Sequence, residues 1–374
     1  MRPRDAGEPH RTATTLELFF DLVFVIAVAS AASGLHHALA EGHPEGILTF
    51  AMVFFAIWWA WMNFTWFATS FGTDDWLYRV MTIVQMGGVL IFAAGIPRIF
   101  AEGDFRLGVA GYIVMRLAMV GQWLRAARHP GPERAAALTY AVGIAVVQVL
   151  WVGFLFVPSE FRSAAFIALM LAELAVPILA EYRNRLPWHP HHITERYGLF
   201  TIIVLGEGLL GASNAIIEAI EEVELLGPLL WIATLTLVAT AALWWVYFWA
   251  PHHRMITSFR SSLRYGYGHY FIFASAAAFA AGIEVEIARL THHTELTFVQ
   301  TSYAISVPIA VFLVAVWLVT MRGSCNRTVN IAMPTAAALV LLDPLLPIPA
   351  TMITLVLIAL VIVLVRNPPL PQRR

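Results

Sequence analysis

Two acids, Asp21 and Glu207, stand 186 residues apart within long apolar segments of the sequence. A carboxylate inside a membrane costs roughly 3 kcal/mol or more unless it is paired, protonated or hydrated. Such acids either attract cations and pass protons along a hydrated path, or hold helices together as ion pairs. We expect Asp21, Glu207 and the neighbouring His269 to line an ion or proton pathway. The alternative for Asp21 is a structural ion pair with Arg79.

A second pair of opposite charges, Arg116 and Glu173, is predicted near the middle of the membrane. Arg116 lies ten residues into the apolar segment 106–127, and Glu173 lies eleven residues into 162–182. Because these segments cross in the same direction, both side chains should lie about 15 Å deep at about 1.5 Å per residue. An unpaired charge there is expensive, so we predict that they meet, either as a structural pair or as part of a gate. Arg264 is also expected in a buried ion pair.

The histidines and the cysteine do not predict a metal or cofactor site. Adjacent histidines do not present both rings to one metal from a helix face, unlike an i, i+4 pair. Cys325 is the only cysteine, which excludes an intramolecular disulfide and a CxxC site. No nucleophile, base and metal cluster converges in the sequence, so we expect no enzyme activity, no cofactor and no metal. The histidine pairs at segment ends or in loops are His36-His37, His191-His192, His252-His253 and His292-His293.

The composition is that of a membrane protein. Of the 374 residues, 59% are hydrophobic and 13% are charged, against roughly 25% charged residues in soluble domains. Apolar runs long enough to cross the hydrocarbon core recur along the whole chain. The net charge of -1 and the absence of a basic stripe exclude nucleic-acid binding. The expected partners are the lipid bilayer and monovalent cations or protons, and a homodimer is left open.

We predict an all-α polytopic fold with about twelve membrane-spanning helices. The eleventh segment is the weakest because it is short and contains Pro334 and Asp343, so a tilted or re-entrant helix is an alternative there. The predicted segments are 16–39, 46–70, 76–97, 106–127, 135–157, 162–182, 196–217, 227–250, 263–288, 297–321, 327–345 and 349–366.

The arginines predict the orientation. With these segments, 18 Arg lie on the side of the N-terminus, 4 lie on the other side, and Arg116 lies within a span. Cytoplasmic loops carry an excess of basic residues. Both termini are therefore predicted in the cytoplasm.

The segments form two similar halves. Short motifs recur in the same order at spacings between 183 and 188 residues, which predicts duplication of a six-helix unit. An even number of spans in each copy makes the two copies parallel. The recurring motifs are Trp58-Trp59 with Trp244-Trp245, Thr69-Ser70-Phe71 with Thr257-Ser258-Phe259, 92–96 with 279–283, and Arg183-Asn184 with Arg366-Asn367. The predicted parts are a cytoplasmic segment 1–15, a first repeat 16–185, a cytoplasmic linker 186–195, a second repeat 196–367 and a cytoplasmic tail 368–374.

Several local motifs have structural interpretations. Trp58 and Trp59 are expected to pack helices together. Asp74 and Asp75 stand where a helix N-cap and acids at the positive end of the helix dipole belong; a cation site there is the alternative. Gly206 is a small residue that lets helices approach closely.

The stretches 17–25 and 195–207 resemble the two signature stretches of the bacterial low temperature requirement protein A (LtrA) family. The resemblance to this family covers essentially the whole chain. Gly208 departs from the family, where a Ser is expected after the Glu. The resemblance implies a multi-spanning protein of the bacterial cytoplasmic membrane whose biochemical activity is poorly defined. The motif positions are Glu17, Phe20, Asp21, Trp58, Trp59, Asp74, Asp75, Arg79, Glu195, Arg196, Gly206 and Glu207.

The stretch 20–26 is also similar, more weakly, to the Phe-Ser-Asp signature of the endolysosomal potassium channel family, which uses six-helix repeats. Asp21 and a neighbouring Phe match this signature, while Phe20 stands where it has Ser. In that family the first helix of each repeat lines the pore. This resemblance implies a cation channel.

Three functions remain open from the sequence. The first is a channel-like or transport pathway for potassium or protons between the two repeats. The second is a proton-coupled secondary transporter of a small solute, in which buried acids, Arg116 and His269 titrate. The third is a membrane scaffold or enzyme without transport. A through-path, a closed pocket or solid packing beside the first and seventh helices would distinguish them.

Overall fold

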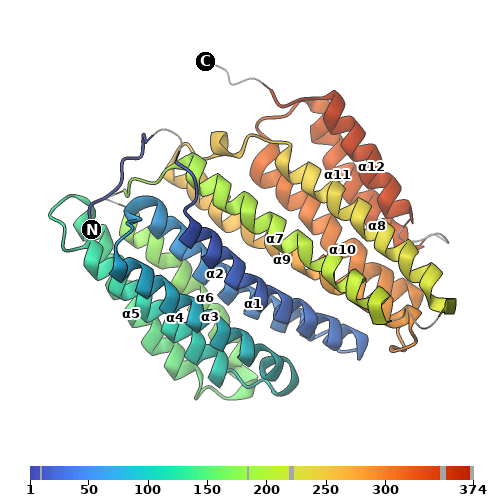
Figure 1. The fold of residues 1–374 in the computed structure, drawn as a ribbon, viewed down its shortest axis with the longest axis horizontal. Coiled ribbons are helices and arrows are strands. Elements are labelled where there is room, and N and C mark those ends of the chain that lie inside the picture. The colour runs from blue at the N-terminus through green and yellow to red at the C-terminus, as the bar shows by residue number, and fades with distance from the viewer. Residues whose placement is uncertain (9–10, 183–184, 219–222, 346–350, 371–374) are drawn as a thin grey trace. The chain divides into compact units, whose positions relative to one another are not determined.

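The computed structural model describes residues 1–8, 11–182, 185–218, 223–345 and 351–370. In these parts of the chain the long regular elements are twelve α-helices and no residue is in a strand (Figure 1). The helices are α1 Thr15–Ala40, α2 Gly46–Phe71, α3 Trp76–Glu102, α4 Arg106–Ala126, α5 Glu133–Phe154, α6 Ser159–Glu181, α7 Pro190–Glu218, α8 Val223–Phe248, α9 Phe259–Leu290, α10 Phe298–Val316, α11 Arg327–Leu342 and α12 Thr351–Arg366. The predicted all-helical fold is confirmed.

Among the described residues, eleven helical segments are long and apolar enough to cross a membrane. The eleventh predicted segment is one of them, since α11 continues through Pro334 and runs on as a short 3-10 turn, Asp343–Leu345. Helix α12, with 16 residues, is apolar but shorter than these eleven segments. Asp343 is buried and accepts a hydrogen bond from the backbone N–H of Ile353, 3.1 Å away, which satisfies a free donor in the first turn of α12.

Several helices begin at side-chain caps that the sequence encodes locally. Asp75 is the N-cap of α3, and its carboxylate accepts from the backbone N–H of Tyr78 at 2.9 Å, which confirms the predicted cap. Ser258 and Thr297 begin α9 and α10 with capping boxes. Such caps pair N–H groups that the first helical turn leaves without partners.

The chain divides into two compact units. Unit 1 contains residues 1–31 and 51–196, and unit 2 contains residues 32–50 and 197–374. Helices α1, α2 and α7 therefore each contribute to both units, and Arg196 is the last residue of unit 1. The repeat boundaries of the sequence analysis stay a prediction. The repeat match at Arg183-Asn184 and the tail arginines Arg373 and Arg374 lie outside the described residues.

The recurring Phe-Ala-Ala-Gly-Ile motif has the same packing role in each unit. In unit 1, a Cβ added at Gly95 of α3 would lie 2.6 Å from the backbone nitrogen of Gly108 on α4. In unit 2, a Cβ added at Gly282 of α9 would overlap the carbonyl oxygen of Ala304 on α10. Only glycine allows so close an approach of two helix backbones. This correspondence supports the duplicated plan.

The recurring tryptophan pair differs between the units. Trp58 and Trp59 of α2 are fully buried, as expected for helix packing, whereas Trp244 and Trp245 of α8 are each 43% exposed. The same motif therefore lines the interior of unit 1 and the surface of unit 2.

Candidate functional site

The buried acid of the first helix, Asp21, is held by an arginine from α7. Arg196 donates to both carboxylate oxygens of Asp21, from Nε at 2.9 Å and from Nη2 at 2.5 Å, and both side chains are at most 1% exposed. The indole N–H of Trp61 on α2 donates to the same carboxylate at 2.7 Å. The prediction that Arg79 pairs with Asp21 was wrong. Two parallel N–H to O bonds make an arginine–carboxylate pair both strong and directional.

Arg79 lies at the surface instead. Its guanidinium pairs with Asp74 at 2.7 Å, and the two side chains are 56% and 78% exposed. Because Arg79 is the fourth residue of α3, it reaches back to the loop acid before the helix. Its hydrogen bond holds the pKa of Asp74 below the usual value. The acid is therefore a surface partner of an arginine.

The pair of Asp21 and Arg196 extends to a second acid and a histidine. Glu17 Oε1 lies 3.2 Å from Arg196 Nη1 and 3.1 Å from His192 Nε2. Its other oxygen accepts from the backbone N–H and the hydroxyl of Thr14, both at 2.8 Å, at the start of α1. We call Glu17, Asp21, His192 and Arg196 the signature network, because Glu17, Asp21 and Arg196 come from the two family-like stretches and His192 contacts Glu17. All four side chains are buried and belong to unit 1.

The structure brings Arg116 and Glu173 together. Arg116 Nη2 donates to Glu173 Oε2 at 2.7 Å, and the side chains are 1% and 0% exposed. Four more groups donate to this carboxylate, so its two oxygens are saturated. A buried charge with this many donors is compensated where it stands, which is the arrangement expected of a structural pair. The other donors are Trp59 at 2.9 Å, Tyr112 at 3.0 Å, Gln148 at 3.2 Å and Trp151 at 3.3 Å.

Arg264, expected in a buried ion pair, is exposed. It lies close to the start of α9, and no ion pair involves it within the described parts of the chain. The prediction was wrong, because Arg264 lies in the second turn of α9 with its side chain exposed, where a long basic side chain reaches water.

His269 is fully buried but is not a neighbour in contact with Glu207, contrary to the prediction. Its Nδ1 donates to the carbonyl oxygen of Tyr265 at 2.7 Å, which leaves Nε2 to accept from the hydroxyl of Tyr247 at 3.0 Å. His252 makes the equivalent pair of bonds, to the Tyr247 carbonyl at 2.7 Å and the Tyr265 hydroxyl at 3.0 Å. In both rings each nitrogen thus makes a hydrogen bond, one as donor and one as acceptor, as in a neutral imidazole.

Glu207 differs from Asp21 and Glu173. Its side chain is 8% exposed, and among the described residues no hydrogen bond or ion pair involves it. Glu284 of α9 is its charged neighbour. Glu284 Oε2 in turn lies 3.2 Å from Nδ1 of His36, near the end of α1. These three residues all lie in unit 2. The sequence analysis did not predict that they come together, although the position of Glu284 inside the apolar segment 263–288 was a signal that it could have used.

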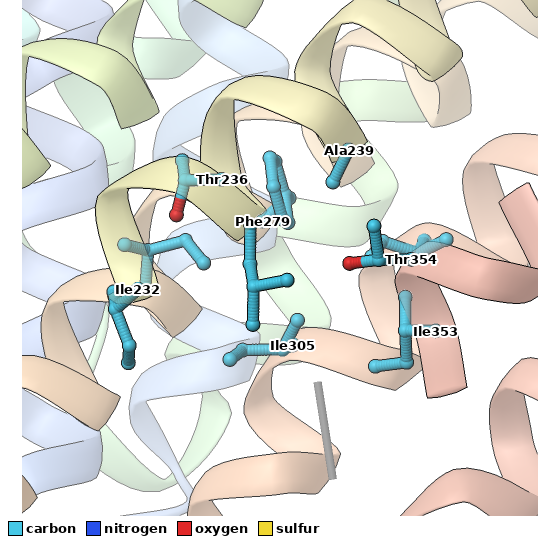
Figure 2. A pocket seen from close by; sticks show the side chains of 10 residues that line it. Ile232, Thr236, Ala239, Phe279, Ile305, Ile353 and Thr354 are labelled. Carbon is cyan, nitrogen blue, oxygen red and sulfur yellow. The ribbon is translucent and has the colours of Figure 1, made fainter. Parts of the chain in front are cut away.

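A small pocket in unit 2 is lined by isoleucines, a phenylalanine and two threonines of α8, α9, α10 and α12 (Figure 2). No charged side chain lines it, so it does not offer a cation the carboxylates that would replace its water. In the described parts of the chain, no three His, Cys, Asp or Glu side chains are placed to hold a metal ion. The pocket lining is Ile232, Leu235, Thr236, Ala239, Phe279, Ile283, Ile305, Ile309, Ile353 and Thr354.

The helical fold and the buried charges define a polytopic α-helical membrane protein. The family described as "Bacterial low temperature requirement A protein (LtrA)" matches residues 12–365, nearly the whole chain. The chain therefore belongs to the LtrA family. The signature network joins the two stretches by which the sequence resembles that family.

A similar protein is an uncharacterized protein of Rhizobium meliloti (strain 1021), 28% identical over 244 residues. The match covers 62% of this chain and 57% of that protein. The chain thus spans little more than half of this relative.

We predict that Glu173 stabilises unit 1 through its five donors. Replacing Glu173 with Gln leaves the Arg116 charge buried without a counter-charge, which should lower the free energy of unfolding by about 3 to 5 kcal/mol. Glu160→Gln, at an exposed position of the same helix, should change it by less than about 0.5 kcal/mol. Denaturant titration in micelles measures both, and equal stabilities of the two variants would contradict the structural role.

We predict a pH-dependent stability from His252, which lies in the loop between α8 and α9. Burial lowers the pKa of His252 to about 4, against about 6.5 in an unfolded chain. Because the unfolded chain binds more protons between these values, stability should fall as the pH drops from about 6.5 to about 4, by on the order of 3 kcal/mol. Melting temperatures of wild type and His252→Asn across this range test it; parallel curves would refute the assignment.

Proposed function

We propose that the protein is a cation pathway, for protons or monovalent cations such as potassium, and that Glu207 is the acid that meets the ion. The observation that carries the proposal is the difference between the buried acids. Glu207 is buried with no bonded partner among the described residues, while Asp21 and Glu173 each hold an arginine. An intramembrane acid without a counter-charge marks an ion or proton pathway.

Asp21 has a different role in this proposal. An ion that bound Asp21 would have to displace a guanidinium hydrogen-bonded to both of its oxygens. Removing one partner of a buried pair leaves the other charge uncompensated. We therefore assign Asp21 to the attachment of α7 and not to ion transfer.

The remaining expectations belong to the same proposal. We place the protein in the bacterial inner membrane with both termini in the cytoplasm, on the basis of the arginine asymmetry. The lipid bilayer and the transported cation are its proposed partners, and we propose no enzyme activity. A proton-coupled carrier of a polar solute is less well supported, because the pocket of Figure 2 has hydroxyls as its only polar side chains.

The test is potassium, sodium and proton flux into liposomes containing the purified protein. Glu207→Gln should reduce the flux of the transported cation by about tenfold or more, equivalent to about 1.4 kcal/mol in the barrier. Glu41→Gln, the same exchange at an exposed position in unit 2, should retain wild-type flux.

Two outcomes would overturn the proposal. One is the absence of wild-type flux of any of these cations under an imposed gradient. The other is full flux through Glu207→Gln, which would show that this acid does not meet the ion.

A further inference from the structure

We infer that Glu207, Glu284 and His36 form a proton-binding site within unit 2, in which one proton resides on either Glu207 or Glu284. Glu207 is the acid of the proposed function, and the inference rests on that function for transport but not for proton binding. Neither Glu284 nor His36 belongs to the family-like stretches. The site thus adds two residues to the pathway and names the proton as its cation.

The packing of α7 on α9 brings the carboxylates of Glu207 and Glu284 to the same face of α7. A Cβ added at Gly208 would lie 3.5 Å from Cα of Ala280, and one added at Gly211 would lie 2.7 Å from Oε1 of Glu284. Glu207 and Gly211 are four residues apart on α7, so they share a helix face. The Glu284 carboxylate therefore lies against α7 one turn from Glu207, in space that the missing side chain of Gly211 leaves free.

The charges of the cluster require a cation. Two negative charges about one helical turn apart in a low-dielectric span repel each other, and a proton on one of the two carboxylates removes this repulsion. A metal ion is the weaker candidate, since hard cations take about six to eight oxygen ligands and the described residues hold no metal-binding group of three.

His36 provides the exchange route. Its Nδ1 lies 3.2 Å from Glu284 Oε2, and the side chains of His36 and Glu284 are 19% and 23% exposed, against 8% for Glu207. When imidazolium gives its proton to the carboxylate, the N–H bond breaks and an O–H bond forms, leaving neutral imidazole and neutral acid. Imidazole is the side chain best suited to exchange protons with water near neutral pH. The partly exposed pair thereby connects buried Glu207 to solvent.

Infrared difference spectroscopy of the protein in lipid, titrated with pH, tests the site without measuring transport. A proton held by Glu207 or Glu284 gives the carbonyl stretch of a protonated carboxylic acid at a pH where isolated acids are ionised. Glu207→Gln and Glu284→Gln should each remove or shift this band. Glu41→Gln, at an exposed position, should leave it unchanged.

A glycine pair on α7 supplies a test that keeps every titratable group. Gly211→Ala displaces the Glu284 carboxylate and should move the midpoint pH of the band by on the order of one unit. Gly206→Ala is the matched control and should not move it. The prediction that Gly206 lets helices approach closely was wrong, because an added Cβ there meets nothing within 4 Å.

The outcomes separate the two proposals. A band that is absent in wild type, or that survives unchanged in Glu207→Gln and Gly211→Ala, overturns the proton site. A band that responds as expected while the liposomes show no flux supports the site and overturns only the transport function. If potassium or sodium reduces the band, the site binds a metal cation in place of the proton, which would contradict the inference.

Discussion

The structure depends on one constraint, the free-energy cost of placing charge in a membrane interior. The guanidinium of Arg196 lowers this cost most directly. Arg196 lies between Asp21 and Glu17, with the Asp21 oxygens 2.5 and 2.9 Å from its nitrogens. One cation therefore lies against two acids and offsets part of the cost of burying them in the span. Because Arg196 is the last residue of unit 1, this interaction also ties the start of α7 to that unit.

The two units use intramembrane charge in different ways. Unit 1 contains the signature network and the saturated carboxylate of Glu173, so its acids are compensated by arginines and aromatic N–H and O–H donors. Unit 2 contains His269, a neutral imidazole hydrogen-bonded to Tyr247 and Tyr265. It also contains Glu207, which lies beside Glu284 and has no counter-charge among the described residues. One unit is thus built around ion pairs, and the other contains a titratable cluster.

The sequence predicts what depth and composition determine. Apolar length locates the helices, and equal depth on parallel spans locates Arg116 opposite Glu173. It does not predict which face of a helix points inward, so Arg79 was chosen for Asp21 although its side chain is exposed on α3. Arg196 was counted as a loop-side cation, because nothing in a span starting at residue 196 shows that the helix begins at Pro190. Contacts between helices distant in the chain, such as α1 with α9, likewise need the fold.

The central claim is that Asp21 is held by Arg196 and is not available to an ion. The most direct measurement is a double-mutant cycle on unfolding stability in micelles, with Asp21→Asn, Arg196→Gln and the double variant, and the same cycle with Arg79→Gln. The account predicts a coupling energy of about 3 kcal/mol between Asp21 and Arg196, and none with Arg79 beyond about 0.5 kcal/mol. Strong coupling of Asp21 to Arg79, or none to Arg196, would contradict it.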